Sequence, residues 1–67
     1  MEIQFTIPDK YENKKALLNR MINKYRGDYN ISETKDGSIY MLEFENVNLG
    51  KEFQRELDIL IPDLYKY

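Results

Sequence analysis

The side chains that could do chemistry are few in this chain, because it contains no histidine and no cysteine. These two residue types supply the usual zinc, copper and haem ligands, and histidine is the commonest general base near neutral pH. A nucleophile would have to be a hydroxyl, and its base a carboxylate or a lysine. We therefore expect a protein that is not an enzyme and holds no metal or cofactor. The candidate hydroxyls belong to Thr6, Ser32, Thr34, Ser38 and the tyrosines.

Glu43 and Glu45 are two residues apart, so they share one face of an extended strand. Such a pair could flank a cation or work as an acid pair. A solvated acidic strip is the commoner use of this spacing, and it is the interpretation that we adopt.

The charges are divided unevenly along 67 residues, a length that predicts one small domain over 1–67. Residues 1–27 contain six basic and three acidic residues, a net charge of +3. Residues 28–67 contain four basic and nine acidic residues, a net charge of −5. A folded molecule should therefore have a basic side and an acidic side, which can orient a partner or a second copy of the chain.

The sequence predicts a cytoplasmic protein that makes no membrane contact. No apolar run approaches the length of a transmembrane segment, and the alternating polarity after Met1 suits a strand better than a leader. The lack of cysteine also fits a reducing compartment.

The stretch 28–47 predicts a β-hairpin around which the other elements pack. Asp36-Gly37 signals a two-residue type I′ turn, which needs positive φ at both central positions. With that loop, Thr34 pairs with Ile39, and alternation sorts the two strands into two faces. The apolar face contains Tyr29, Ile31, Tyr40, Leu42 and Phe44, with Glu33 at its end. The other face contains Asn30, Ser32, Thr34, Ile39, Met41, Glu43 and Glu45.

A strand and a helix precede the hairpin. Residues 2–7 alternate in polarity, as a strand with one apolar face does. Asp9 and Glu12 fit a capping box for a helix that runs to about Tyr25, and Gly27 is placed to terminate it. The apolar stripe of this helix comprises Tyr11, Leu17, Leu18, Met21, Ile22 and Tyr25.

A second helix follows the hairpin. We expect it from Leu49 to about Leu60, with Asn48 as N-cap and Pro62 just beyond its end. Ile59 falls off its apolar stripe and is expected to be exposed. Residues 64–67 form either a loose tail or a very short fourth strand.

This element order predicts an α+β fold, a single βαββα(β) domain whose antiparallel sheet is covered on one face by two helices. The simplest arrangement places the first strand beside the third and antiparallel to it, as in a ferredoxin-like or truncated split-βαβ fold. The alternative places the first strand beside the second. The helices should cover the face that bears Ile3, Phe5, Ile7, Ile31, Leu42 and Phe44.

The residue types on the opposite face of the sheet indicate protein binding. An apolar centre of Ile39 and Met41 with a polar rim has the composition of an interface, and the rim comprises Gln4, Thr6, Ser32 and Glu43. Tyr65 and Tyr67 add amphipathic contact residues, and the edge from Tyr29 to Thr34 could accept an added strand. We expect an adaptor or inhibitor that covers a surface of another protein. Phages and mobile elements often encode very small proteins with such charge polarity, and we hypothesise that origin.

Two alternatives remain open. The first is a nucleic-acid-associated regulator that uses the basic margins of the first helix: Lys10, Lys14, Arg20 and Lys24. The predicted open face has no aromatic residue to stack on bases, and a pI near 5.0 limits phosphate contact, so we do not expect nucleic acid as the partner. The second is a homodimer or larger structural assembly that pairs sheet face to sheet face.

Overall fold

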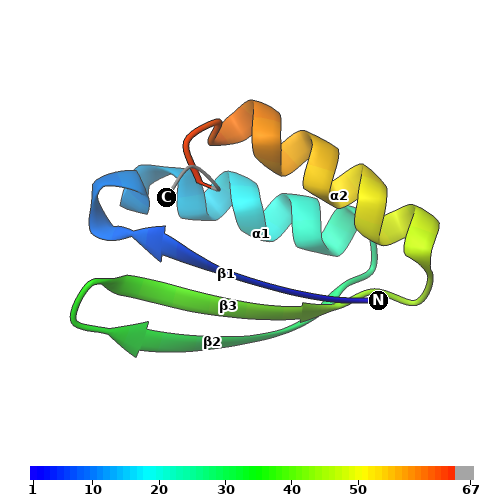
Figure 1. Ribbon diagram of the computed structural model, residues 1–67, viewed down its shortest axis with the longest axis horizontal. Helices are drawn as coiled ribbons and strands as arrows, with labels where there is room; N and C mark the ends of the chain where they lie inside the picture. Colours follow the sequence, from blue (N-terminus) through cyan, green and yellow to red (C-terminus); the bar gives the residue numbers. More distant parts are fainter. Residues whose placement is uncertain (65–67) are drawn as a thin grey trace.

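Three strands and three helical segments follow one another in the computed structural model, which describes residues 1–64 (Figure 1). They are β1 (Glu2–Pro8), the 3-10 helix η1 (Asp9–Lys14), α1 (Lys15–Lys24), β2 (Asp28–Thr34), β3 (Gly37–Glu43) and α2 (Val47–Leu60). Within this part of the chain, no helix is both long enough and apolar enough to cross a membrane.

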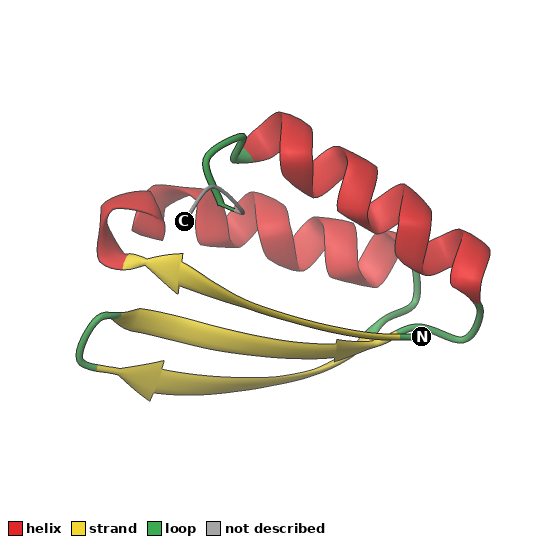
Figure 2. Cartoon of the chain, in the orientation of Figure 1, coloured by secondary structure: helices red, strands yellow, loops and turns green. Residues whose placement is uncertain are grey.

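The strand order β1-β3-β2 confirms the predicted α+β architecture. Both pairs of neighbouring strands are antiparallel, and the N-terminal strand lies beside the third strand and not beside the second. Both helices pack on the same side of the sheet, so the other side is left open (Figures 1 and 2).

The hydrophobic core lies between the helices and the two strands β1 and β3. Aromatic rings join three elements, because Phe5 stacks on Tyr40 with 5.4 Å between ring centroids and on Phe53 with 6.2 Å. The described core residues are Ile3, Phe5, Ile7, Leu18, Ile22, Tyr40, Leu42, Phe44, Phe53, Leu57, Ile61 and Leu64.

Strand β2 contributes no residue to the described buried core. All seven of its residues are exposed. Ile31, which we expected beneath the helices, is 37% exposed and Tyr29 is 51% exposed. That expectation was wrong, because β2 is an edge strand that pairs with β3 alone among residues 1–64, and neither Ile31 nor Tyr29 belongs to the buried core cluster.

The hairpin loop lies one residue earlier than predicted, which shifts the pairing of the two strands by two residues. Thr34 pairs with Gly37 and Ser32 with Ile39, so Lys35 and Asp36 form the loop. The Thr34 hydroxyl accepts the Asp36 N–H (3.3 Å) and donates to the Gly37 carbonyl (2.7 Å), which closes the turn. The two faces stay as predicted, because a shift of two residues preserves side-chain alternation.

The start of the first helix differs from the prediction. Residues 9–14 form a 3-10 helix preceded by Pro8, and no described side chain caps it, so the capping box of Asp9 and Glu12 does not form. Contacts with the end of α2 hold this segment instead. The Tyr11 hydroxyl donates to Asp63 Oδ2 (2.6 Å), and Lys14 Nζ donates to the Leu60 carbonyl (3.2 Å).

The end of α1 is a Schellman motif in which Arg26, and not Gly27, is left-handed. The φ of Arg26 is 57°, and the Gly27 N–H donates to the Ile22 carbonyl (2.9 Å). Gly27 is required for a different reason: a Cβ there would lie 2.8 Å from the Phe44 ring. We expected Gly27 to end the helix as the left-handed residue, but Arg26 has that conformation, and the missing side chain of Gly27 makes room for the Phe44 ring.

Helix α2 begins at Val47, two residues before the predicted start. Asn46 is its N-cap, and its side chain accepts the Leu49 N–H (3.0 Å); Asn48, which we had expected in that role, lies inside the helix. The helix ends at Leu60 before Pro62, as predicted, and Ile59 is exposed, as predicted.

Replacing the Asn46 side chain should destabilise the fold measurably. Asn46→Ala removes the acceptor for the Leu49 N–H, and loss of an N-cap costs about 1 kcal/mol. Asn48→Ala is the matched control and should change stability by less than about 0.5 kcal/mol, because it removes no cap. Urea unfolding followed by circular dichroism measures both, and equal losses would contradict the assignment of Asn46 as cap.

Candidate protein-binding surface

The open face, defined as the side of the sheet away from α1 and α2, is ordered in rows by the strand register. Each row takes one residue from β1, one from β3 and one from β2. The rows are Glu2–Glu43–Asp28, Gln4–Met41–Asn30 and Thr6–Ile39–Ser32. The six predicted residues Gln4, Thr6, Ser32, Ile39, Met41 and Glu43 therefore come together on one face.

The apolar members of the rows both belong to the central strand β3. Met41 is 43% exposed and Ile39 is half-buried. The amides of Gln4 and Asn30 flank Met41, whereas hydroxyls flank Ile39. The result is an apolar centre with polar, uncharged neighbours, a composition that resembles the apolar core and polar rim of protein interfaces.

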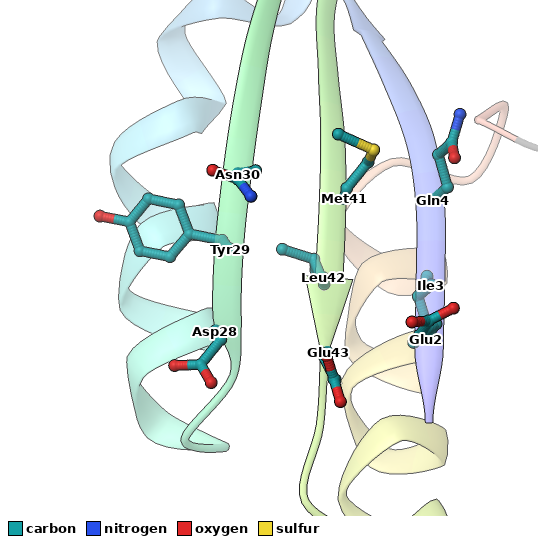
Figure 3. Close-up of a pocket in the computed structure, with 9 residues that line it drawn as sticks. All are labelled: Glu2, Ile3, Gln4, Asp28, Tyr29, Asn30, Met41, Leu42 and Glu43. Carbon is teal, nitrogen blue, oxygen red and sulfur yellow. The ribbon is translucent and has the colours of Figure 1, made fainter.

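A hollow of about 480 Å³ lies at one end of this face (Figure 3). The side chains of Gln4, Asn30 and Met41 stand in front of the strands, with the helices behind them, whereas Tyr29 extends past the outer edge of β2. The hollow thus joins the apolar centre to the exposed edge strand. Its lining comprises Glu2, Ile3, Gln4, Asp28, Tyr29, Asn30, Met41, Leu42 and Glu43.

The first row is acidic across all three strands. Glu43 stands opposite Glu2 on one side and opposite Asp28 on the other, and all three residues are exposed. Like charges on neighbouring strands repel, and a cation from a partner would relieve that repulsion. Among residues 1–64 no group of three carboxylates is arranged to hold a metal ion. Glu45, expected beside Glu43, lies beyond the end of β3.

A chain of two hydrogen bonds, centred on the buried Ser38, connects α1 to the hairpin. Lys15 Nζ donates to Ser38 Oγ (2.8 Å), and that hydroxyl donates to Glu33 Oε2 (2.8 Å). A serine beside a lysine can serve as a nucleophile, but Ser38 is fully buried and a substrate could not reach its hydroxyl. We interpret this chain as a structural link between the helix and both strands of the hairpin.

The predicted basic residues do not form one surface. Lys24 Nζ lies 2.8 Å from Glu56 and Lys14 donates to the Leu60 carbonyl, so both ammonium groups contact α2. Lys10 lies over the Tyr11 ring, 5.0 Å from its centroid, and Arg20 is exposed. This arrangement leaves the nucleic-acid hypothesis without a continuous basic patch on α1.

The contact between the helices predicts a pH dependence. Hydrogen bonds from Lys24 and Tyr25 lower the pKa of Glu56 below its ordinary value of 4.5. A lowered folded-state pKa adds stability above the ordinary value, and that stability is lost as the pH falls through the lowered pKa. Thermal unfolding of Glu56→Gln should therefore change less than that of the wild type between about pH 5 and about pH 3. Lys24→Met should flatten the profile similarly, and superimposable profiles for all three proteins would contradict the assignment.

Sequence reasoning missed part of this surface. Glu2 and Asp28 join the acidic row through the register alone, and Tyr29 was assigned to the covered face. Tyr65 and Tyr67, two predicted contact residues, lie outside the described part of the chain.

No protein-family model, no curated protein and no solved structure matches this chain. Function must therefore be argued from the surface itself.

Proposed function

We propose that this chain is a small protein-binding module that acts sterically, as an adaptor or inhibitor, through the open face of its sheet. The observation that supports it is the pair Ile39 and Met41, which stands on an uncovered central strand between polar neighbours. The acidic row at one end of the face favours a partner segment with apolar side chains beside a lysine or arginine.

The outer edge of β2 extends the proposed surface. In the part of the chain that the structure describes, its backbone pairs with β3 on one side and with no strand on the other, and its seven residues are exposed. A partner segment in extended conformation could add to this edge by backbone hydrogen bonds while its side chains contact the open face. Tyr29, at 51% exposure beside the hollow, offers an aromatic contact for such a segment.

A peptide-display selection tests the proposal without knowledge of the natural partner. Random peptides of about 16 residues, long enough to cross a three-stranded sheet, are selected on the immobilised wild-type chain. We expect the selected peptides to combine apolar residues with lysine or arginine. Their affinity should fall at least about tenfold for the double variant Ile39→Asp, Met41→Asp, because it places charges in the apolar centre.

Two further variants make the result specific. Ile39→Thr with Met41→Gln keeps residues that strands tolerate, and it should weaken binding while circular dichroism confirms the fold. Ile59→Asp makes the same apolar-to-acid change on α2, away from the open face, and should leave peptide affinity unchanged. Peptides that bind both double variants as tightly as the wild type would refute the sheet-face proposal.

A further inference from the structure

The backbone of β2 has hydrogen-bonding groups on its outer side that pair with no strand among residues 1–64. The Met1 carbonyl accepts the Phe44 N–H (2.8 Å) and the Met1 nitrogen donates to the Phe44 carbonyl (2.9 Å), so residue 44 is hydrogen-bonded toward β1. Hydrogen bonding alternates along an antiparallel strand, so residues 38, 40 and 42 of β3 bond toward β1, and residues 37, 39, 41 and 43 bond toward β2. Their partners in β2 are residues 34, 32, 30 and 28. The N–H and carbonyl groups of Tyr29, Ile31 and Glu33 therefore point away from the sheet.

This edge lacks the features that usually keep an edge strand from pairing with another chain. Such edges are commonly very short, or they carry a proline, a lysine or a β-bulge. Strand β2 is seven residues long and contains neither proline nor lysine. Its pairing with β3 runs from residue 28 to residue 34 without a bulge. The edge is therefore suited to accept a further strand.

The side of β2 that faces the helix layer carries uncovered apolar side chains. Tyr29 pairs with Leu42 and Ile31 pairs with Tyr40, so both lie on the side of the sheet that bears the core. Tyr29 is nevertheless 51% exposed and Ile31 is 37% exposed. The Tyr29 ring extends past the outer edge of β2 (Figure 3). A strand added at this edge would bring its own side chains against both residues.

Strand β2 is complementary to an antiparallel copy of itself. When Ile31 stands opposite Ile31 of a second copy, the outward-pointing residues of one strand meet the outward-pointing residues of the other, as an antiparallel ladder requires. All seven residues then find a partner, and no like charges stand opposite each other. The pairs are Ile31–Ile31, Tyr29–Glu33, Asn30–Ser32 and Asp28–Thr34.

Asp28 and Lys35 add complementary charges at both ends of this pairing. Both residues are exposed, and within residues 1–64 neither side chain forms a hydrogen bond or an ion pair. Asp28 stands opposite Glu43 on β3, so its carboxylate is next to a like charge. In the self-paired register it stands opposite Thr34 of the second copy, the residue before Lys35. The lysine ammonium of each copy then lies beside the acidic row of the other.

We infer that the outer edge of β2 is the interface of a homodimer in which the sheets of two copies join into one continuous antiparallel sheet. The two-fold axis passes between the two Ile31 residues, perpendicular to the sheet, so the helices of both copies lie on the same side. Tyr29 and Ile31 of both copies then line the strip between the two helix layers. This interface goes beyond the proposed function, because Ile39 and Met41 take no part in it and the open face stays uncovered. It competes with a partner segment only for the edge of β2.

The small size of a single strand pairing sets the strength to expect. A standard interface buries about 800 Å² per partner, and one added strand buries less. We expect a dissociation constant on the order of 10–100 µM. Sedimentation equilibrium of the full chain measures it: the mass should rise from 8.1 kDa toward twice that value between about 1 µM and about 1 mM.

Two substitutions at Ile31 test the location of the interface. Ile31→Lys places two lysines beside the two-fold axis, and it should raise the dissociation constant at least about tenfold. Ile31→Pro removes an N–H that points outward and makes no bond to β3, so it should weaken the dimer while circular dichroism confirms the fold. Met41→Lys is the matched control, because it makes the same apolar-to-lysine change at a residue of β3 that is 43% exposed. It should leave the mass curve unchanged.

Two outcomes would overturn the inference. One is a monomer at every concentration. The other is a dimer that Met41→Lys dissociates and Ile31→Lys does not, which would place self-association on the open face. Neither outcome decides the peptide selection, because there the loss of affinity is expected for the variants at Ile39 and Met41.

Disulfide formation tests the register, because the chain has no cysteine of its own. Asn30 of one copy stands opposite Ser32 of the other at a position without hydrogen bonds, where Cα atoms lie about 4.5 Å apart, a separation that a disulfide can span. When Asn30→Cys and Ser32→Cys are mixed and oxidised with oxidised glutathione, most of the linked dimer should contain one chain of each variant. Asn30→Cys linking mainly to itself, or Ser32→Cys to itself, would indicate a register shifted by two residues and would refute the placement of Ile31 on the axis.

Discussion

Phe53→Ala is expected to unfold a large fraction of the molecules at 25 °C. The Phe53 ring is fully buried and contacts two other aromatic rings, with centroid distances of 6.2 Å to Phe5 and 5.0 Å to Phe44. Removing a buried phenylalanine side chain costs about 3–5 kcal/mol. A domain of 67 residues has a total stability of roughly 3–10 kcal/mol, so one cavity removes much or all of it.

Circular dichroism in a urea series measures this effect. Val47→Ala is the matched control, because Val47 lies on the same helix but is 53% exposed. The control should change the free energy of unfolding by less than about 0.5 kcal/mol. If Phe53→Ala and Val47→Ala unfolded at the same urea concentration, Phe53 would not be the centre of the core.

Gly37→Ala is expected to destabilise the protein by about 3 kcal/mol, through the backbone and not through a cavity. Gly37 has φ of 150°, in the region that side chains rarely adopt, and a Cβ there would overlap the Ile7 carbonyl oxygen of β1. A carbonyl oxygen within a strand cannot move aside as a flexible side chain can. The pairing of Gly37 with Pro8 would open, and with it the end of the sheet.

Asp36→Ala is the control within the same turn. Asp36 contributes its backbone N–H to the Thr34 hydroxyl, and alanine keeps that donor, so the loss should stay below about 1 kcal/mol. A type I′ turn centred on Asp36-Gly37 would need positive φ at residue 36. In the described residues positive φ occurs at Arg26 and Gly37. Equal losses for the two variants would show that Gly37 is not constrained as the structure indicates.

The sequence predicted the faces of the sheet well because alternation is a local property. Ile3, Phe5 and Ile7 point to the core, and Ile39 and Met41 point away from it. The turn was misplaced because an Asp-Gly pair signals positive φ without stating whether the glycine lies in the loop or begins the next strand. Here the Thr34 side chain closes the loop one residue earlier, and Gly37 becomes the first residue of β3.

Features that depend on how elements meet were harder to predict. The exposure of Ile31 depends on which strands the helices cover, and the acidic row depends on the register of three strands. Leu17 fits the apolar stripe of α1, yet it is 48% exposed because the stripe is wider than the contact with the sheet. The apolar depression between α1 and α2, lined by Leu17, Met21, Ile59 and Leu60, therefore has no signature in the sequence of either helix alone.

The strand order also determines how long β1 remains unpaired while the chain is being synthesised. Among residues 1–64, strand β1 pairs with β3 alone, and the paired residues of β3 follow it by roughly thirty to forty positions. A hairpin such as β2–β3, in contrast, closes in about 1–10 µs. At a translation rate of about 5–20 residues per second, the apolar face of β1 waits about 2–8 s for its partner. Segment 3–7, with Ile3, Phe5 and Ile7, is β-prone and uncharged. It is the part of the nascent chain where a chaperone, or aggregation, would act first.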